Sequence, residues 1–325
     1  MPDRFFAIFR TTLVETIRQP IYGVILVATA LLLVFNVALA AFTLDNDNKL
    51  LLDLGLSTLL LSGLFLSAFS ASGVLAREIE NKTAMIVISK PVGRPLFIAA
   101  KFMGLFAALV WAYYLSFLVF VLCQRHGVLQ STSDPWDAPV LAFGFGSLVV
   151  SIVGAAFCNY FYGKEFSTTA ILFLTPLLTL AVLAVGKLDE KWKVIDFASN
   201  YVGGQVIIAA YLVFLAVTIC AAVALAASTR LGQLMTLLIC IGILFLGVAS
   251  DYAFGQHAGT SRWADLAYRV IPNMGLFWVI DGLSAGTEAT TVTWEYVGYV
   301  TTYAVAITGG MVGLAVALFE RREVG

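Results

Sequence analysis

Eight stretches of this 325-residue chain run for 20 residues or more without Asp, Glu, Lys or Arg. They cover residues 19–44, 54–76, 102–124, 138–163, 166–186, 197–229, 231–250 and 296–319. An ionised side chain is costly at the centre of a bilayer, and a helix crosses the hydrocarbon core with about 20 apolar residues. The pattern therefore predicts an integral membrane protein in which each run is one crossing.

The composition agrees with this interpretation. Hydrophobic residues make up 60% of the chain and charged residues 12%, whereas a soluble domain has about 25% charged residues. We expect an all-α polytopic protein with about eight transmembrane helices in a single transmembrane domain, residues 1–325. The predicted spans are about 21–43, 54–76, 102–123, 139–162, 168–186, 203–227, 232–250 and 296–319. The net charge of −1 argues against a nucleic-acid partner.

The few charges predict an orientation. Lys and Arg concentrate in cytoplasmic loops. With eight spans and both termini in the cytoplasm, 12 of the 19 basic residues fall in inner segments and 7 in outer ones. We therefore expect cytoplasmic termini, a cytoplasmic hairpin at 77–101 and an outer segment at 251–293.

Residues 3–18 precede the first span. Phe6, Phe9, Leu13 and Ile17 recur at helical spacing, and the charged side chains fall on another face. This predicts an amphipathic helix lying in the inner membrane interface. The alternative is a polar extension of the first span.

The predicted spans hold no Asp, Glu, Lys or Arg, although proton relays and enzymes in membranes usually place ionisable groups there. His126 and His257 fall in predicted outer loops. Neither Gly163-Lys164 nor Gly186-Lys187 belongs to a phosphate-binding GxxxxGK[ST] loop. We expect no catalytic residues, no metal and no cofactor in this chain. An ion-coupled carrier stays open as an alternative, because carbonyls and hydroxyls alone can bind sodium.

Small side chains recur every four residues in three predicted spans. They are Gly63, Ser67 and Ala71, then Ser147, Ser151 and Ala155, and finally Gly309 and Gly313. Such stripes let helix backbones approach closely. They fit either packing within one subunit or a dimer seam or substrate-facing wall.

The segment from Arg77 to Pro95, between the second and third spans, is charged at both ends and apolar in the middle. Ile79, Met85 and Ile86 have no membrane reason to be apolar, because the flanking charges hold the segment at the surface. A short helix that offers an apolar ridge to a cytoplasmic partner fits this pattern. A membrane-surface hairpin without a partner is the alternative.

The segment resembles the permease subunits of ABC transporters of the second exporter class, particularly those with a separately encoded ATPase. The matching residues are Arg77, Glu78, Glu80, Thr83, Ser89, Lys90, Pro91, Val92, Gly93, Arg94, Lys101, Phe102 and Gly104. Ala100 stands where many relatives have Gly, and eight spans exceed the six usual in that family.

The resemblance implies a multi-pass subunit of an ATP-driven exporter in the inner membrane of a prokaryote. Its partners would be two copies of an ABC ATPase, which bind ATP and Mg, a second permease copy (identical or related), and membrane lipids. The hairpin would be the coupling helix that seats in a groove of the ATPase.

The resemblance also suggests residue roles. Glu78 and Glu80 would pair with basic residues of the ATPase or cap the coupling helix, and the apolar ridge would fill the groove. Lys90, Arg94 and Lys101 would anchor the hairpin at the anionic inner leaflet. For Arg94 and Lys101 the alternative is that they are ordinary positive charges of an inner loop. The expected contact set is Arg77, Glu78, Ile79, Glu80, Lys82, Thr83, Met85, Ile86, Lys90, Pro91 and Arg94, with Lys164 and Glu165 as a second, smaller contact. A membrane scaffold or assembly subunit would share the spans and need no ATPase.

Overall fold

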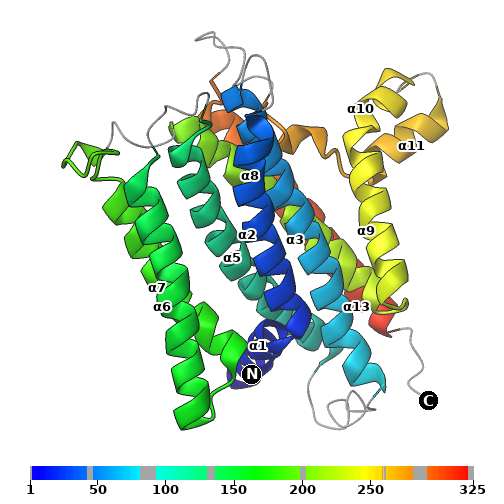
Figure 1. The fold of residues 1–325 in the computed structure, drawn as a ribbon. Coiled ribbons are helices and arrows are strands. Elements are labelled where there is room, and N and C mark those ends of the chain that lie inside the picture. The colour runs from blue at the N-terminus through cyan, green and yellow to red at the C-terminus, as the bar shows by residue number, and fades with distance from the viewer. Residues whose placement is uncertain are drawn as a thin grey trace. The chain divides into compact units, whose positions relative to one another are not determined.

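The computed structural model describes residues 2–41, 47–80, 93–129, 136–197, 203–257, 259, 261–280 and 291–320, with side chains left out at 2 and 75–80. The described chain is all-α, as predicted (Figure 1). Its helices are α1 (Pro2–Arg18), α2 (Pro20–Ala40), α3 (Asp47–Glu80), α5 (Arg94–His126), α6 (Ala138–Tyr162), α7 (Phe166–Val185), α8 (Gly204–Ser228), α9 (Gln233–Val248), α10 (Ser250–Ala253), α11 (Arg262–Val270) and α13 (Trp294–Glu320). Short 3₁₀ turns lie at Gly255–His257 and Gly275–Phe277.

Seven helices are long and apolar enough to cross a membrane: α2, α3, α5, α6, α7, α8 and α13. Each coincides with one of the eight predicted spans. The helices α3 and α5 extend well beyond the predicted bounds, because a helix can continue past the hydrocarbon core into the interface, where charged residues are tolerated. The chain is therefore a multi-pass membrane protein.

The eighth predicted span, 232–250, is not one straight helix. α9 has 16 residues, and at 1.5 Å per residue it is about 24 Å long, short of the roughly 30 Å of hydrocarbon. It qualifies as a span only together with Ser250–His257, which bends away from it by 64°. The segment is thus broken at Ala249.

The helices cluster into two compact units. Unit 1 contains Met1–Ile21, Leu60–Val110 and Ile208–Gly325, and unit 2 contains Tyr22–Leu59 and Trp111–Ile207. The helices α3, α5 and α8 contribute residues to both. The predicted coupling segment and both ends of the chain belong to unit 1.

The helix α8 supplies much of the core of unit 1. It is apolar on every side, which is typical of a fully buried helix, and most of its residues are buried. At Gly63 of α3 an added Cβ would lie only 2.5 Å from a Val217 methyl group of α8. The Phe106 ring of α5 packs beside Phe214, with centroids 5.9 Å apart. The parts of α3 and α5 in unit 1 therefore pack directly on α8.

The helix α9 runs antiparallel to α13. Just before α9 begins, Arg230 Nε donates a 3.1 Å hydrogen bond to the Leu318 carbonyl near the end of α13. Beside the other end of α9, the chain returns after α11, and the backbone N–H of Asn273 donates to the Tyr303 hydroxyl at 2.8 Å, about four turns earlier in α13. At Gly247 an added Cβ would lie 2.6 Å from the Pro272 carbonyl oxygen, so the returning chain touches the end of α9.

The helices α1 and α13 both contact the first turns of α5, at one end of unit 1 that we call the basal end. Glu15 of α1 lies 3.9 Å from Lys101 of α5, and Arg94 at the start of α5 contacts Glu320 of α13. Seven helices are candidate crossings, or eight if the broken segment α9–α10 is also one. That both termini lie on one side of the membrane stays a prediction. That the basal end faces the cytoplasm stays a prediction from the Lys and Arg distribution.

In unit 2, α6 and α7 form an antiparallel hairpin. Gly163 closes α6 in the left-handed conformation at φ 62°, which glycine adopts without strain. The Glu165 carboxylate then caps α7, accepting from the backbone N–H groups of Ser167 at 3.0 Å and Thr168 at 2.8 Å. Further along the hairpin, Ser147 Oγ donates to the Leu177 carbonyl at 3.2 Å.

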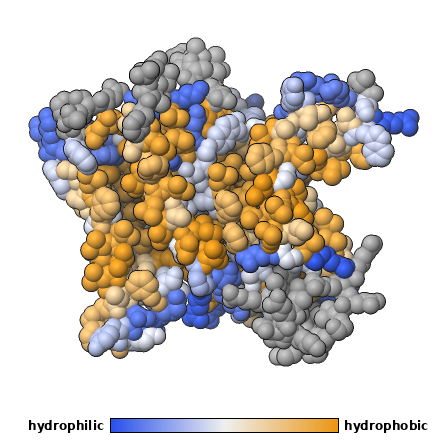
Figure 2. Space-filling view, turned by 45° about the vertical axis from the view of Figure 1, so that its right-hand side comes forward, coloured by the Kyte–Doolittle hydropathy of each residue, from blue (hydrophilic) through white to orange (hydrophobic). Residues whose placement is uncertain are grey.

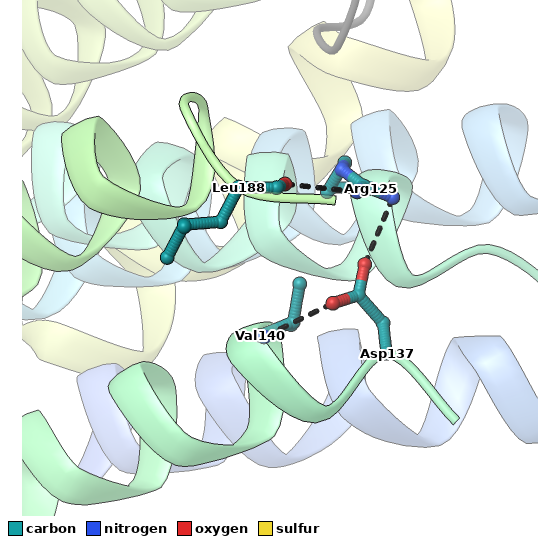
Figure 3. A network of polar contacts seen from close by, with 4 residues as sticks. All are labelled: Arg125, Asp137, Val140 and Leu188. Atoms are coloured by element: carbon teal, nitrogen blue, oxygen red, sulfur yellow. Dashed lines mark hydrogen bonds and ion pairs between the residues drawn. The ribbon is translucent and has the colours of Figure 1, made fainter. Parts of the chain in front are cut away.

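A buried ion pair joins the other ends of these helices (Figure 3). Arg125 Nη1 lies 2.8 Å from Asp137 Oδ2, and the Asp137 side chain is 2% exposed. Asp137 Oδ1 accepts from the Val140 N–H at the start of α6, and Arg125 Nη2 donates to the Leu188 carbonyl beyond α7. The pair therefore connects α5, α6 and the turn after α7.

Candidate functional site

The predicted coupling segment lies between α3 and α5. The last turn of α3 contains Arg77, Glu78, Ile79 and Glu80, of which the structure describes the backbone alone. Lys82, Thr83, Met85, Ile86, Lys90 and Pro91 lie outside the described residues. Arg94 is the first residue of α5. The segment is thus bounded on both sides by membrane-spanning helices, and its own conformation stays a prediction.

Arg94 fastens the start of α5 to the end of α13. Its Nη1 donates a 2.6 Å hydrogen bond to the Glu320 carbonyl oxygen. One turn further, the Phe97 ring stacks on Phe319 with centroids 5.8 Å apart. Arg94 therefore binds another helix of the protein, whereas the sequence suggested that it binds lipid headgroups.

Arg230 reinforces the same helix end. It lies in the turn between α8 and α9, and its hydrogen bond goes to Leu318, two residues before Glu320. The last four carbonyls of a helix lack partners within the helix. The helix dipole also stabilises positive charge at this end. Two guanidinium groups from distant parts of the sequence therefore cap the C-terminus of α13.

The Lys101 side chain is buried at the basal end, with 2% exposure. Its ammonium group lies 3.9 Å from the half-exposed Glu15 carboxylate and 5.6 Å from the centre of the Phe97 ring. The prediction that Lys101 anchors the hairpin to lipid headgroups is therefore wrong. Sequence periodicity did not reveal that α1 would cover this position.

The predicted N-terminal helix exists as α1, and it packs closely on α5. At Gly104 an added Cβ would lie 2.7 Å from Thr12 Cβ and 2.8 Å from the Phe9 carbonyl oxygen. Thr12 and Thr16 are fully buried, whereas Phe6 is exposed. Ile17, predicted for the membrane-facing side, is also buried. The helix therefore binds the protein through Thr12, Thr16 and Ile17 and leaves Phe6 exposed for the predicted membrane interface.

The pair Lys164 and Glu165 lies in the turn of the α6–α7 hairpin. Both Glu165 carboxylate oxygens accept hydrogen bonds from the first turn of α7. Lys164 is exposed. Of the two residues predicted to make a second partner contact, Glu165 has a local structural role and Lys164 has a free surface position.

The small-residue stripes occupy three different environments. Gly63, Ser67 and Ala71 are buried, and Gly63 faces α8. Ser147, Ser151 and Ala155 are also buried, on α6 toward α7. Gly309 and Gly313 of α13 are exposed, and an added Cβ would meet no atom within 4 Å at either. The first two stripes contact other helices of this chain, and the third is open.

Several contacts of the basal end were not anticipated. Arg230 counted only among the inner basic residues, and Glu15 only among the charged side chains of the N-terminal helix. Within the described residues, no group of three or more His, Cys, Asp or Glu side chains is placed to hold a metal ion. The polar contacts of the basal end connect α1, α5, α13 and the α8–α9 turn to one another.

Comparison with known protein families finds no family that matches this chain, and comparison with curated proteins finds no significant match.

Proposed function

We propose that this chain is the membrane-spanning permease subunit of an ATP-driven ABC exporter, and that the segment from Arg77 to Pro95 docks on a separate ATPase. The observation that carries the proposal is the match of this segment to the coupling region of such permeases. Its position between α3 and α5 supports the proposal, because a docked partner would act on two membrane helices at once.

The contacts of the basal end offer a route for that action. Movement of the hairpin displaces the start of α5, which is hydrogen-bonded to α13 through Arg94. The end of α13 is in turn bonded to the α8–α9 turn through Arg230. The ATPase shifts the balance between two membrane conformations by as much as its affinity for them differs.

An external energy source explains the sparse charge of the spans. ATP and Mg would bind the partner ATPase, so the membrane helices need no proton relay. Two permease copies and two ATPase copies would form the working unit. Lys164 would provide a second contact with the ATPase from the α6–α7 turn.

The test is co-expression with the ATPase encoded beside this chain, followed by copurification and ATPase assays. Glu78→Ala, Glu80→Ala and Met85→Ala are the coupling variants. Glu295→Ala, at the exposed start of α13, and Met235→Ala, on the exposed face of α9, are matched controls. The coupling variants should lose copurification and substrate-stimulated turnover, and the controls should retain both.

Unchanged association in the coupling variants would show that the hairpin is not the docking segment. If the unaltered chain copurifies with no ATPase, the scaffold subunit or the ion-coupled carrier becomes the better reading.

A further inference from the structure

A helical hairpin follows α9 and projects from it (Figure 1). It consists of α10, the turn at Gly255–His257 and α11. No residue of α11 is buried. From the sequence, the expected role of the outer segment 251–293 is anchoring in the membrane interface by its aromatic side chains, and a substrate gate is the alternative.

The helix α11 has two distinct faces. Trp263, Leu266 and Val270 recur at helical spacing and are 81%, 54% and 62% exposed. Arg262, Asp265 and Arg269 form the neighbouring face, on which both arginines are exposed and Asp265 is partly exposed. Figure 2 shows hydrophilic atoms over the upper side of this projection and hydrophobic atoms below them.

The hairpin begins at the depth of a membrane interface. The helix α9 starts at the basal end, and the bend follows 16 residues later. That length is about 24 Å, which approaches the far boundary of a hydrocarbon core about 30 Å thick. A segment that turns by 64° there leaves the direction of the span and runs along the interface.

Hydrogen bonds fix the hairpin in this orientation. Asp251 Oδ1 of α10 accepts from the Tyr268 hydroxyl at 2.9 Å and from Asn273 Nδ2 at 2.8 Å. The Asn273 N–H donates to Tyr303 of α13. The Asp251 carboxylate raises the pKa of Tyr268 through the hydrogen bond and its charge. The apolar face of α11 therefore has a defined direction.

We infer that α11 lies in the membrane interface at the end of unit 1 opposite the basal end. Trp263, Leu266 and Val270 enter the boundary between headgroups and acyl chains, and Arg262 and Arg269 meet lipid phosphates. Phospholipid suits both faces, because an amphipathic helix with Trp on one side and Arg beside it is typical of interfacial binding. This inference does not depend on the proposed transport function.

The test uses the full chain in liposomes with phospholipids brominated either near the headgroup or near the chain end. Subtracting the emission of Trp263→Phe from that of the unaltered chain isolates Trp263. An interfacial helix lies about 5–10 Å into the boundary, so we expect about twofold stronger quenching by the shallow bromines. Quenching by aqueous iodide with no effect of either lipid would overturn the inference and indicate a face open to water or to a soluble partner.

A second measurement does not depend on Trp263→Phe folding correctly. Spin labels at Leu266→Cys and Arg269→Cys probe the two faces of one turn, in a Cys158→Ser background because the other three cysteines are buried. The label at 266 should be several-fold more accessible to oxygen, relative to a water-soluble nickel chelate, than the label at 269. Equal ratios at the two sites would contradict the interfacial position.

Discussion

The guanidinium group of Arg94 donates to the carbonyl oxygen of Glu320 at 2.6 Å, which joins the first residue of α5 to the last residue of α13. The two residues are 226 positions apart in the sequence. This hydrogen bond therefore connects α5, which follows the predicted coupling segment, to α13 at the basal end.

Replacing Arg94 by Ala should weaken this fastening even without an ATPase. A hydrogen bond of this kind contributes about 0.5–1.5 kcal/mol, and the exposed position favours the lower end. Thermal unfolding in detergent measures the loss. Arg269→Ala is the matched control, because Arg269 pairs with Asp265 one turn away on the exposed surface of α11. An equal effect of the two substitutions would mean that the contact with Glu320 adds no stability.

Gly104→Ala should be destabilising because backbone and side-chain atoms of α1 occupy the space of the new methyl group. Overpacking of a close contact costs about 1–3 kcal/mol. Gly313→Ala is the control, since its Cβ would meet open space and Ala has the higher helix propensity. Unfolding midpoints of the two variants should move in different directions. A neutral Gly104→Ala would show that α1 does not pack against α5.

Lys101 should resist amine-reactive labelling. Its side chain is buried beneath α1, whereas Lys164 and Lys191 are exposed. In the folded protein, a water-soluble acylating reagent should modify the two exposed lysines and leave Lys101 unmodified, and mass spectrometry detects the modified residues. After denaturation all three should react. Rapid labelling of Lys101 in the native state would contradict its burial.

Asp137→Asn should be strongly destabilising. Removing one partner of a buried ion pair costs about 3–5 kcal/mol, and Asp137 holds both Arg125 and the first turn of α6. Asp265→Asn removes a carboxylate from an exposed pair on α11, where the expected loss is at most about 0.5 kcal/mol. Comparison of unfolding temperatures for these variants distinguishes a structural clamp from a dispensable surface pair.

The broken segment α9–α10 should behave as a crossing. A reporter enzyme fused after Gly232 should lie on the same side of the membrane as both termini, and one fused after Gly259 on the opposite side. Activity of reporters that work on only one side of the membrane gives the answer. Identical sides for the two fusions would make the segment re-entrant and would place the termini on different sides.

The sequence located the spanning helices because the bilayer excludes charge, and that physical rule acts locally along the chain. The helix bounds were less accurate for the same reason. α5 begins at Arg94, eight residues before the charge-free stretch that starts at Phe102. A charge-free stretch locates the residues that lie in the hydrocarbon core. The helix itself can continue beyond them into the interface, where charged residues are tolerated. The charge-free stretch 231–250 also gave no sign of the bend at Ala249.

The connections within the basal end could not be predicted in this way. Arg94, Lys101 and Arg230 all read as positive charges on the inner side. Their separate roles depend on which helices meet in space, and periodicity within one helix does not contain that information. The small-residue stripes show the same limit, since Gly63 is packed on α8 and Gly313 is open although their spacing is alike.

The shortness of α9 has a consequence for the lipid around it. Leu234, Leu238 and Phe245 on its outer surface are exposed and apolar, which suits contact with acyl chains. The helix is about 6 Å shorter than an average hydrocarbon core. Such a mismatch is relieved by local thinning of the bilayer, at a cost of fractions of a kcal/mol per ångström. The bilayer should therefore be thinner beside α9 than around the longer spanning helices.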